Sequence, residues 1–169
     1  ASITSGFFGK FIGDRNSEII TSLFVSISAL LSLILFYQVI VNGYENNVVI
    51  ATWINSGTLD VNWSIKVDAL SSVMLVVVTL VSSLVHIYSI GYMSHDPHKP
   101  RFMAYLSLFT FAMLTLVTSD NFLQLFFGWE GVGLCSYFLI GFWYKKDSAN
   151  AAAIKAFVVN RVGDFGFAL

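Results

Sequence analysis

Residues 69–93 read ALSSVMLVVVTLVSSLVHIYSIGYM, a run without a single Asp, Glu, Lys or Arg. A helix rises about 1.5 Å per residue and the hydrocarbon core of a bilayer is about 30 Å thick, so about 20 mostly apolar residues can cross it. The run reaches that length and is followed by the turn-forming pair Asp96-Pro97. It therefore predicts a transmembrane helix and makes lipid the natural solvent of the fold.

Outward from this span, the chain divides into further apolar stretches. Residues 17–41 predict another full span, with Ser17 as its N-cap and Asn42-Gly43 after its end. The stretch from 101 to 143 is too long for one helix, and the polar cluster at residues 118–121 supplies a turn that divides it. The expected spans are residues 1–12 (the end of a partial span), 17–41, 69–93, 102–118, 121–144 and 148–169.

Residues 48–67, between the first two complete spans, have a different periodicity. Apolar residues at odd positions from Leu59 to Val67 alternate with polar residues at even positions from Asp60 to Asp68. A period of two is typical of a β-strand. Together with the preceding apolar run and the turn signal Asn55-Ser56-Gly57-Thr58, it predicts a small β-hairpin in an extramembrane loop.

The positions of Lys and Arg predict the orientation of the chain. Short loops on the inner side of a membrane are enriched in these residues, and here every second predicted loop is basic, through Lys10 and Arg15, Lys99 and Arg101, and Lys145 and Lys146. The hairpin is then expected on the outer side. We expect one all-α integral membrane domain over residues 1–169, with about five to six spans and this β-hairpin in one outer loop.

Composition excludes several classes of function. Hydrophobic residues make up 56% and charged residues 11% of the chain, against about 25% charged residues in soluble domains. The net charge is −1 without a run of like charges, which gives no support for a nucleic-acid partner. A single cysteine, Cys135, excludes an intrachain disulfide. His95, Asp96 and His98 lie close in sequence, but Pro97 and a solvated setting favour an ordinary loop over a metal site.

Glu130 is the most informative residue, because it lies about nine residues into a predicted span. A charged carboxylate at membrane depth costs roughly 2.5 to 3.5 kcal/mol, which pairing or protonation can relieve. Either route suits a proton carrier, and the alternative is a carboxylate that only joins helices together. The flanking glycines Gly128, Gly131 and Gly133 allow a neighbouring helix to approach closely, and packing is their expected role.

Other ionisable residues accompany Glu130. In the last helix Arg161 and Asp164 are three residues apart and can pair on one face, with Lys155 about two turns earlier. They form either a structural salt bridge or the charges to which Glu130 responds. His86 lies deep in the span 69–93 and can accept and donate protons, although packing alone also explains a buried histidine.

The run from Asp120 to Tyr137, DNFLQLFFGWEGVGLCSY, resembles subunit 5 of respiratory complex I, the NADH:ubiquinone oxidoreductase. The likeness extends from residue 94 to 102 and from 140 to 164, and is weak before about residue 60. The resemblance implies an antiporter-like helix bundle of the membrane arm that translocates protons as NADH is oxidised and quinone is reduced. The missing Met and the uncapped apolar end at Leu169 fit a fragment of that subunit, or one piece of a split protein.

The family implies a role for each intramembrane charge. Glu130 matches the essential carboxylate of a proton channel and works with a lysine that lies beyond Leu169. Asp164 matches an acidic residue implicated in proton transfer or charge coupling, and Lys155 and Arg161 match basic residues of the same polar network. His86 is a further candidate for this network.

The resemblance also implies the setting of the chain. No cofactor is expected on this chain, whereas the parent complex implies FMN, iron-sulfur clusters and ubiquinone. Expected partners are the other membrane-arm subunits, the remaining C-terminal part of the subunit and the lipid of a bacterial or mitochondrial inner membrane. Two alternatives stay open: a subunit of the related multisubunit cation/proton antiporters, and a helical scaffold whose buried charges are structural.

Overall fold

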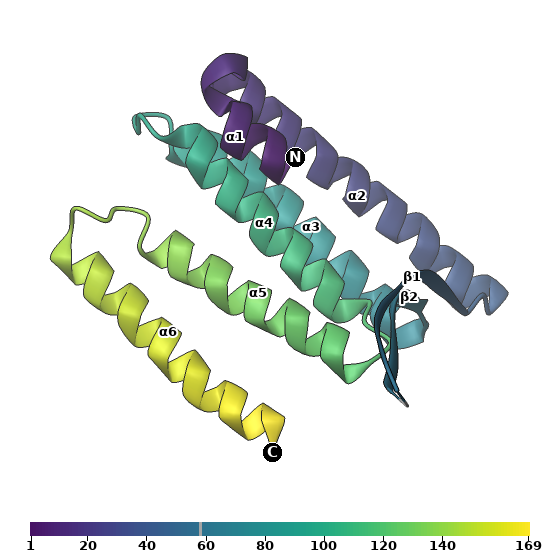
Figure 1. Cartoon of the computed structure of the whole chain (residues 1–169). Helices are drawn as coiled ribbons and strands as arrows, with labels where there is room; N and C mark the ends of the chain where they lie inside the picture. The colour runs from purple at the N-terminus through teal and green to yellow at the C-terminus, as the bar shows by residue number, and fades with distance from the viewer. Residues whose placement is uncertain (58) are drawn as a thin grey trace.

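The computed structural model describes residues 1–57 and 59–169, apart from the side chains of Lys10 and Ala168. Within these residues the helices and strands, in chain order, are α1 (Ser2–Ile12), α2 (Asp14–Asn42), β1 (Asn46–Ser56), β2 (Leu59–Val67), α3 (Ala69–Tyr92), α4 (Lys99–Val117), α5 (Phe122–Ile140) and α6 (Asp147–Ala168). The long helices lie side by side, with the hairpin at one end of the bundle (Figure 1). The predicted helical membrane fold with one small hairpin is confirmed.

Four helices have the length and apolar composition needed to cross a bilayer in the part of the chain that is described: α2, α3, α4 and α5. α6 is 22 residues long but carries Lys155, Arg161 and Asp164, and α1 has 11 residues. The helices bury small and hydroxyl-bearing side chains between them and expose large apolar ones, as with Ser72 (fully buried) and Leu84 (66% exposed). Small residues at the interfaces and large apolar residues outside are the pattern expected in lipid.

The boundary between α1 and α2 lies at Gly13. Its φ of +85° and ψ of +156° form a backbone conformation that residues with a side chain rarely adopt, so the glycine permits the sharp change of direction. α2 therefore begins at Asp14, and the predicted N-cap at Ser17 is wrong. Ser17 lies inside the helix and is buried.

The predicted break at residues 118–121 coincides with the turn between α4 and α5. Asn121 caps α5, since its side-chain oxygen accepts a hydrogen bond from the backbone N–H of Gln124 at 2.8 Å. The Nδ2 atom of Asn121 donates to the carbonyl of Asn62 in β2, also at 2.8 Å. One side chain thus starts α5 and attaches the hairpin to it.

The hairpin pairs β1 and β2 in antiparallel register, with irregularities between Val49 and Ala51 and between Thr52 and Ile54. Thr58, the last residue of the predicted turn, lies outside the described residues. The alternation of β2 does not translate into simple alternation of burial, because Ser64 is buried while Ile65 is exposed. A polar interface with the helices explains the difference.

This interface runs along the free edge of β2. The side-chain amide of Gln124 accepts from Ser64 N at 3.1 Å and donates to Ser64 O at 2.8 Å, imitating a neighbouring strand. One residue pair further along, Lys66 N donates to the carbonyl of Thr118 at 2.9 Å. Backbone groups that an edge strand would leave unpaired are thereby satisfied by the α4–α5 turn and the first turn of α5.

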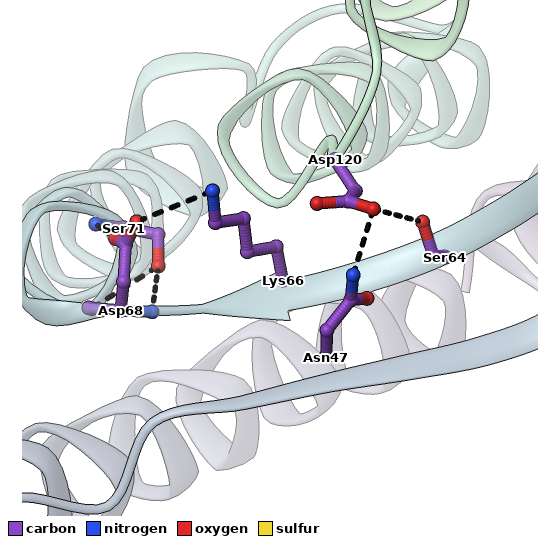
Figure 2. A network of polar contacts seen from close by, with 6 residues as sticks. All are labelled: Asn47, Ser64, Lys66, Asp68, Ser71 and Asp120. Atoms are coloured by element: carbon purple, nitrogen blue, oxygen red, sulfur yellow. Dashed lines mark hydrogen bonds and ion pairs between the residues drawn. The ribbon is translucent and has the colours of Figure 1, made fainter.

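Figure 2 shows the polar contacts that surround this edge. Asp120 accepts a 2.7 Å hydrogen bond from Asn47 of β1 and a longer one from the Ser64 hydroxyl. Where β2 ends, Asp68 caps α3 by accepting from the backbone N–H of Ser71 at 2.8 Å. That bond, assisted by Lys66 at 4.0 Å, holds the pKa of Asp68 below its ordinary value. The hairpin is therefore bound to the ends of three helices.

Candidate functional site

Glu130 lies in the middle of α5, on a segment that packs tightly against its neighbours. A Cβ atom on Gly128 would lie 2.7 Å from the Cα atom of Leu116 in α4, so the two backbones touch there. A Cβ atom on Gly131 would lie 3.0 Å from the Cβ atom of Ala112. The prediction that these glycines serve close helix packing is confirmed, and this packing fixes where the Glu130 side chain leaves α5.

The Glu130 carboxylate pairs with the guanidinium of Arg161 on α6. The same Nη1 atom lies 3.3 Å from Asp164 Oδ2, one turn further along α6, so the pair predicted from the spacing of Arg161 and Asp164 is present. The indole N–H of Trp129 donates to Asp164 Oδ1 at 2.8 Å. Phe157 lies under the guanidinium, with its ring centre 4.6 Å from Arg161 Cζ.

One cation therefore serves two carboxylates, which gives the cluster a formal charge of −1 when all three groups are ionised. The side chain of Asp164 is 10% exposed and that of Glu130 23% exposed, whereas Arg161 is 40% exposed. In the described atoms Asp164 Oδ2 and Arg161 Nε have no hydrogen-bond partner. Such a cluster holds an excess of acceptors where charge is costly, which suits the uptake of a proton.

A cavity of about 250 Å³ adjoins this cluster between α5 and α6. Besides the three charged residues, its lining includes Gly133, Ser136 and Asn160. Gly133 has no side chain to fill this space, and a Cβ atom there would lie 3.3 Å from Asn160 Nδ2. A liquid water molecule occupies about 30 Å³, so the cavity has room for the hydrogen-bonded water that proton transfer requires.

Lys155 is not brought into this cluster. It lies on α6, but its side chain is exposed and forms no ion pair with the residues that the structure describes. Six residues on a helix correspond to about 240° of rotation relative to Arg161 rather than to whole turns. The two basic residues consequently leave α6 in different directions.

His86 is fully buried between α3 and α4, apart from the α5–α6 cluster. Its Nδ1 atom lies 2.7 Å from the carbonyl of Ser82 and must donate, because a carbonyl can only accept. In the neutral imidazole Nε2 then accepts from the Ser107 hydroxyl, 3.1 Å away, and the hydroxyls of Ser82 and Thr110 are 2.5 Å apart. Both ring nitrogens of His86 therefore have hydrogen-bond partners among its neighbours.

The turn that holds His95, Asp96 and His98 lies between α3 and α4 and contacts the connection between α5 and α6. Asp96 accepts from the backbone N–H of His98 at 2.8 Å and from the indole N–H of Trp143 at 3.0 Å. Partial burial opposes the charged form, but these two bonds outweigh it and lower the pKa of Asp96. Across the described residues, three His, Cys, Asp or Glu side chains are nowhere grouped in a way that could hold a metal ion.

Trp129 and Asn160 are members of the site that sequence reasoning missed. Trp129 precedes Glu130 directly, so on a helix it leaves in a different direction, and only the position of α6 brings its indole to Asp164. Asn160 precedes Arg161 and reaches the cavity beside Gly133. The available signal was a side chain with a hydrogen-bond donor directly before each charged residue, Trp129 before Glu130 and Asn160 before Arg161.

Four membrane-length helices, with an ion cluster held between α5 and α6, define a multi-span membrane protein. Comparison with known proteins agrees in two segments. Residues 53–103 match the family described as NADH-ubiquinone oxidoreductase (complex I), chain 5 N-terminus. Residues 119–169, which contain the whole cluster, match the family described as NADH:quinone oxidoreductase/Mrp antiporter, TM.

Individual relatives agree along almost the whole chain. NADH-ubiquinone oxidoreductase chain 5 of Arabidopsis thaliana is 60% identical over 168 residues, which cover 99% of this chain and 25% of that protein. NADH-quinone oxidoreductase subunit L of Rickettsia bellii is 55% identical over 169 residues, which cover 100% of this chain and 26% of that protein. The chain belongs to the NADH-ubiquinone oxidoreductase chain 5/subunit L family, and it spans about a quarter of the length of these curated relatives.

Proposed function

We propose that this chain is the part of a proton-translocating complex I subunit that carries one carboxylate-based transfer site, with Glu130 as the group that takes up and releases the proton. The observation that carries the proposal is the cluster in which Arg161 pairs with Glu130 and lies 3.3 Å from Asp164. Two carboxyl groups share the Arg161 cation at membrane depth, so the position of the guanidinium decides which carboxyl group remains ionised.

The proposed mechanism follows from this shared cation. While Arg161 pairs with Glu130, the carboxylate form of Glu130 is favoured, because a nearby positive charge stabilises it. A shift of the guanidinium toward Asp164 would leave Glu130 in a weakly polar setting, where the protonated form is favoured. The proton would then enter or leave through the cavity lined by Ser136 and Asn160.

Asp164 is proposed as the alternative partner of Arg161, and Trp129 as its positioning residue. The 2.8 Å bond from the Trp129 indole occupies Oδ1 of Asp164 and leaves Oδ2, which lies 3.3 Å from the guanidinium, available to Arg161. Because Trp129 and Glu130 are adjacent on α5, movement of α5 against α6 would change both contacts together. Lys155 and His86, which lie outside this cluster, are proposed only as more distant members of the polar network.

In the intact protein the site is proposed to work with subunits that this chain does not contain. NADH oxidation and quinone reduction belong to the whole complex, whose FMN, iron-sulfur clusters and ubiquinone would be held elsewhere. The proposed partners are other membrane-arm subunits, the remainder of this subunit and lipid. A mitochondrial or bacterial inner membrane is the proposed location.

The test is Glu130→Gln in the intact complex, with proton uptake and NADH oxidation measured together. General acid–base groups contribute about 10²–10⁴-fold, so we expect proton transfer through this subunit to fall by at least about tenfold while the complex still assembles. Glu45→Gln is the matched control, because Glu45 is exposed after α2. Unchanged pumping in an assembled Glu130→Gln complex would refute the assignment.

A second function, cation/proton exchange in a multisubunit antiporter, is favoured by the description of the family that matches residues 119–169. The same cluster would then exchange a cation against the proton. Isolation of the chain's native complex in mild detergent distinguishes the two functions. Co-purifying flavin and iron-sulfur subunits support the oxidoreductase, whereas antiporter-type subunits alone support cation exchange.

A further inference from the structure

We propose that Glu18 is a second proton-exchanging carboxyl of this chain, with Ser22 as its hydroxyl partner and Lys99 as its counter-charge. The site lies near the start of α2, at the end of the bundle where the α1–α2, α3–α4 and α5–α6 connections gather (Figure 1). It is separate from Glu130, and the proposal does not depend on the function proposed for that residue.

The polar atoms at this site are buried and lack hydrogen-bond partners. Glu18 is 6% exposed, Ser17 1% and Ser22 8%. Glu18 Oε1, Ser17 Oγ and Ser22 Oγ are all buried and have no hydrogen-bond partner among the described atoms. Three unsatisfied polar atoms within six consecutive residues of one helix are unusual, since buried polar groups are almost always bonded to protein or water.

A hydroxyl group beside Glu18 suits either protonation state of its carboxyl group. A hydroxyl can donate to a carboxylate or accept from a protonated carboxyl. Ser22 lies one turn after Glu18 on the same face of α2, so it can stabilise Glu18 in either state through a bridging water molecule. Thr21, on the same stretch of α2, already donates to the backbone of Ser17 and is not available for this role.

Lys99 is the cation paired with Glu18. Lys99 Nζ lies 4.0 Å from Glu18 Oε1, too far for a direct hydrogen bond, and its side chain is 22% exposed. Arg101, the next cation on α4, donates instead to the carbonyl of Phe142. The charged residues of α2 nearby are Asp14 and Arg15, which are exposed, while the side chain of Lys10 on α1 is outside the description. Transfer of a proton from hydronium would form an O–H bond on Glu18, leave a neutral water molecule and change the net charge of the pair with Lys99 from zero to +1.

Helix α1 lies against the start of α2, next to the site. α1 packs onto Ser17 and the start of α4 so closely that a Cβ atom on Gly9 would lie 2.7 Å from the Cβ atom of Pro100. Ser5 holds this contact by donating to the carbonyl of Pro100 at 2.9 Å. Glu18 is thus buried beside the α1 contact, while the side chain of Lys99 remains 22% exposed.

The test uses the intact complex and infrared difference spectra recorded between two pH values. We expect a carboxyl band that shifts in D₂O and is lost in Glu18→Gln, but persists in Glu45→Gln and in Glu130→Gln. Lys99→Met and Ser22→Ala should change the pH midpoint or frequency of the band, and they serve as the test if Glu18→Gln fails to assemble. Spectra that are identical in wild type and Glu18→Gln, or a band unmoved by both partner variants, would overturn the proposal.

Discussion

The guanidinium of Arg161 pairs with the carboxylate of Glu130 across the α5–α6 interface, which joins two helices through a single charged contact at membrane depth. Asp164 competes for the same Nη1 atom from one turn along α6. The arrangement makes the state of one acid depend on the other.

Arg161→Gln should destabilise the α5–α6 contact by leaving two carboxylates without their cation. We expect a loss of about 1–3 kcal/mol, less than the roughly 3–5 kcal/mol of a fully buried pair, because Arg161 is 40% exposed. Hydrogen exchange of α6 amides in the intact complex measures the loss. Adding Glu130→Gln should recover part of the protection, and additive effects of the two changes would show that the residues are not coupled.

Gln124→Leu should loosen the hairpin. The change leaves Ser64 N and Ser64 O unsatisfied in a buried place, at a cost of about 1–3 kcal/mol for each group. Faster hydrogen exchange of the Ser64 amide is the expected readout. Asn47→Ala removes an exposed contact to Asp120 and should change this exchange little; equal effects of both substitutions would contradict the role assigned to Gln124.

Gly128→Ala should push α5 away from α4, because the added methyl group would lie 2.7 Å from backbone atoms of Leu116. Overpacking of this kind costs about 1–3 kcal/mol. The yield of assembled complex and its resistance to heating report the effect. Gly91→Ala in α3 is the control, since nothing lies within 4 Å of the added atom, and we expect it to be nearly neutral.

Asp68 should make the start of α3 sensitive to acid. Its pKa in the folded protein lies below the ordinary 3.8, so its contribution is complete above about pH 4 and is lost as the pH falls through the folded pKa. Asp68→Ala should cost about 0.5–2 kcal/mol at neutral pH through loss of the cap, whereas Asp68→Asn retains a cap and loses only the pH dependence. Exchange of first-turn amides from about pH 7 down to about pH 3, which is roughly one unit below the ordinary pKa of an aspartate, measures both. An unchanged pH profile in Asp68→Asn would refute this explanation.

The sequence predicts the helices and the hairpin because hydropathy and a period of two are local signals. The start of α2 was missed because it depends on the backbone conformation of Gly13. A glycine permits this conformation, but its presence in a sequence does not predict it. Spacing on one helix predicted the contact of Arg161 with Asp164. The bond from Trp129 to Asp164 and the approach of Lys99 to Glu18 depend on how separate helices pack, which no local pattern encodes.

The most direct test of the central proposal is the number of protons translocated per NADH oxidised by the intact complex in sealed proteoliposomes, compared between wild type, Glu130→Gln and Glu130→Asp. We predict that Glu130→Gln lowers this ratio or stops coupled turnover, and that Glu130→Asp, which retains a titratable carboxyl, restores part of it. A wild-type ratio and rate in Glu130→Gln would contradict the account, because proton transfer would then not need the Glu130 carboxylate.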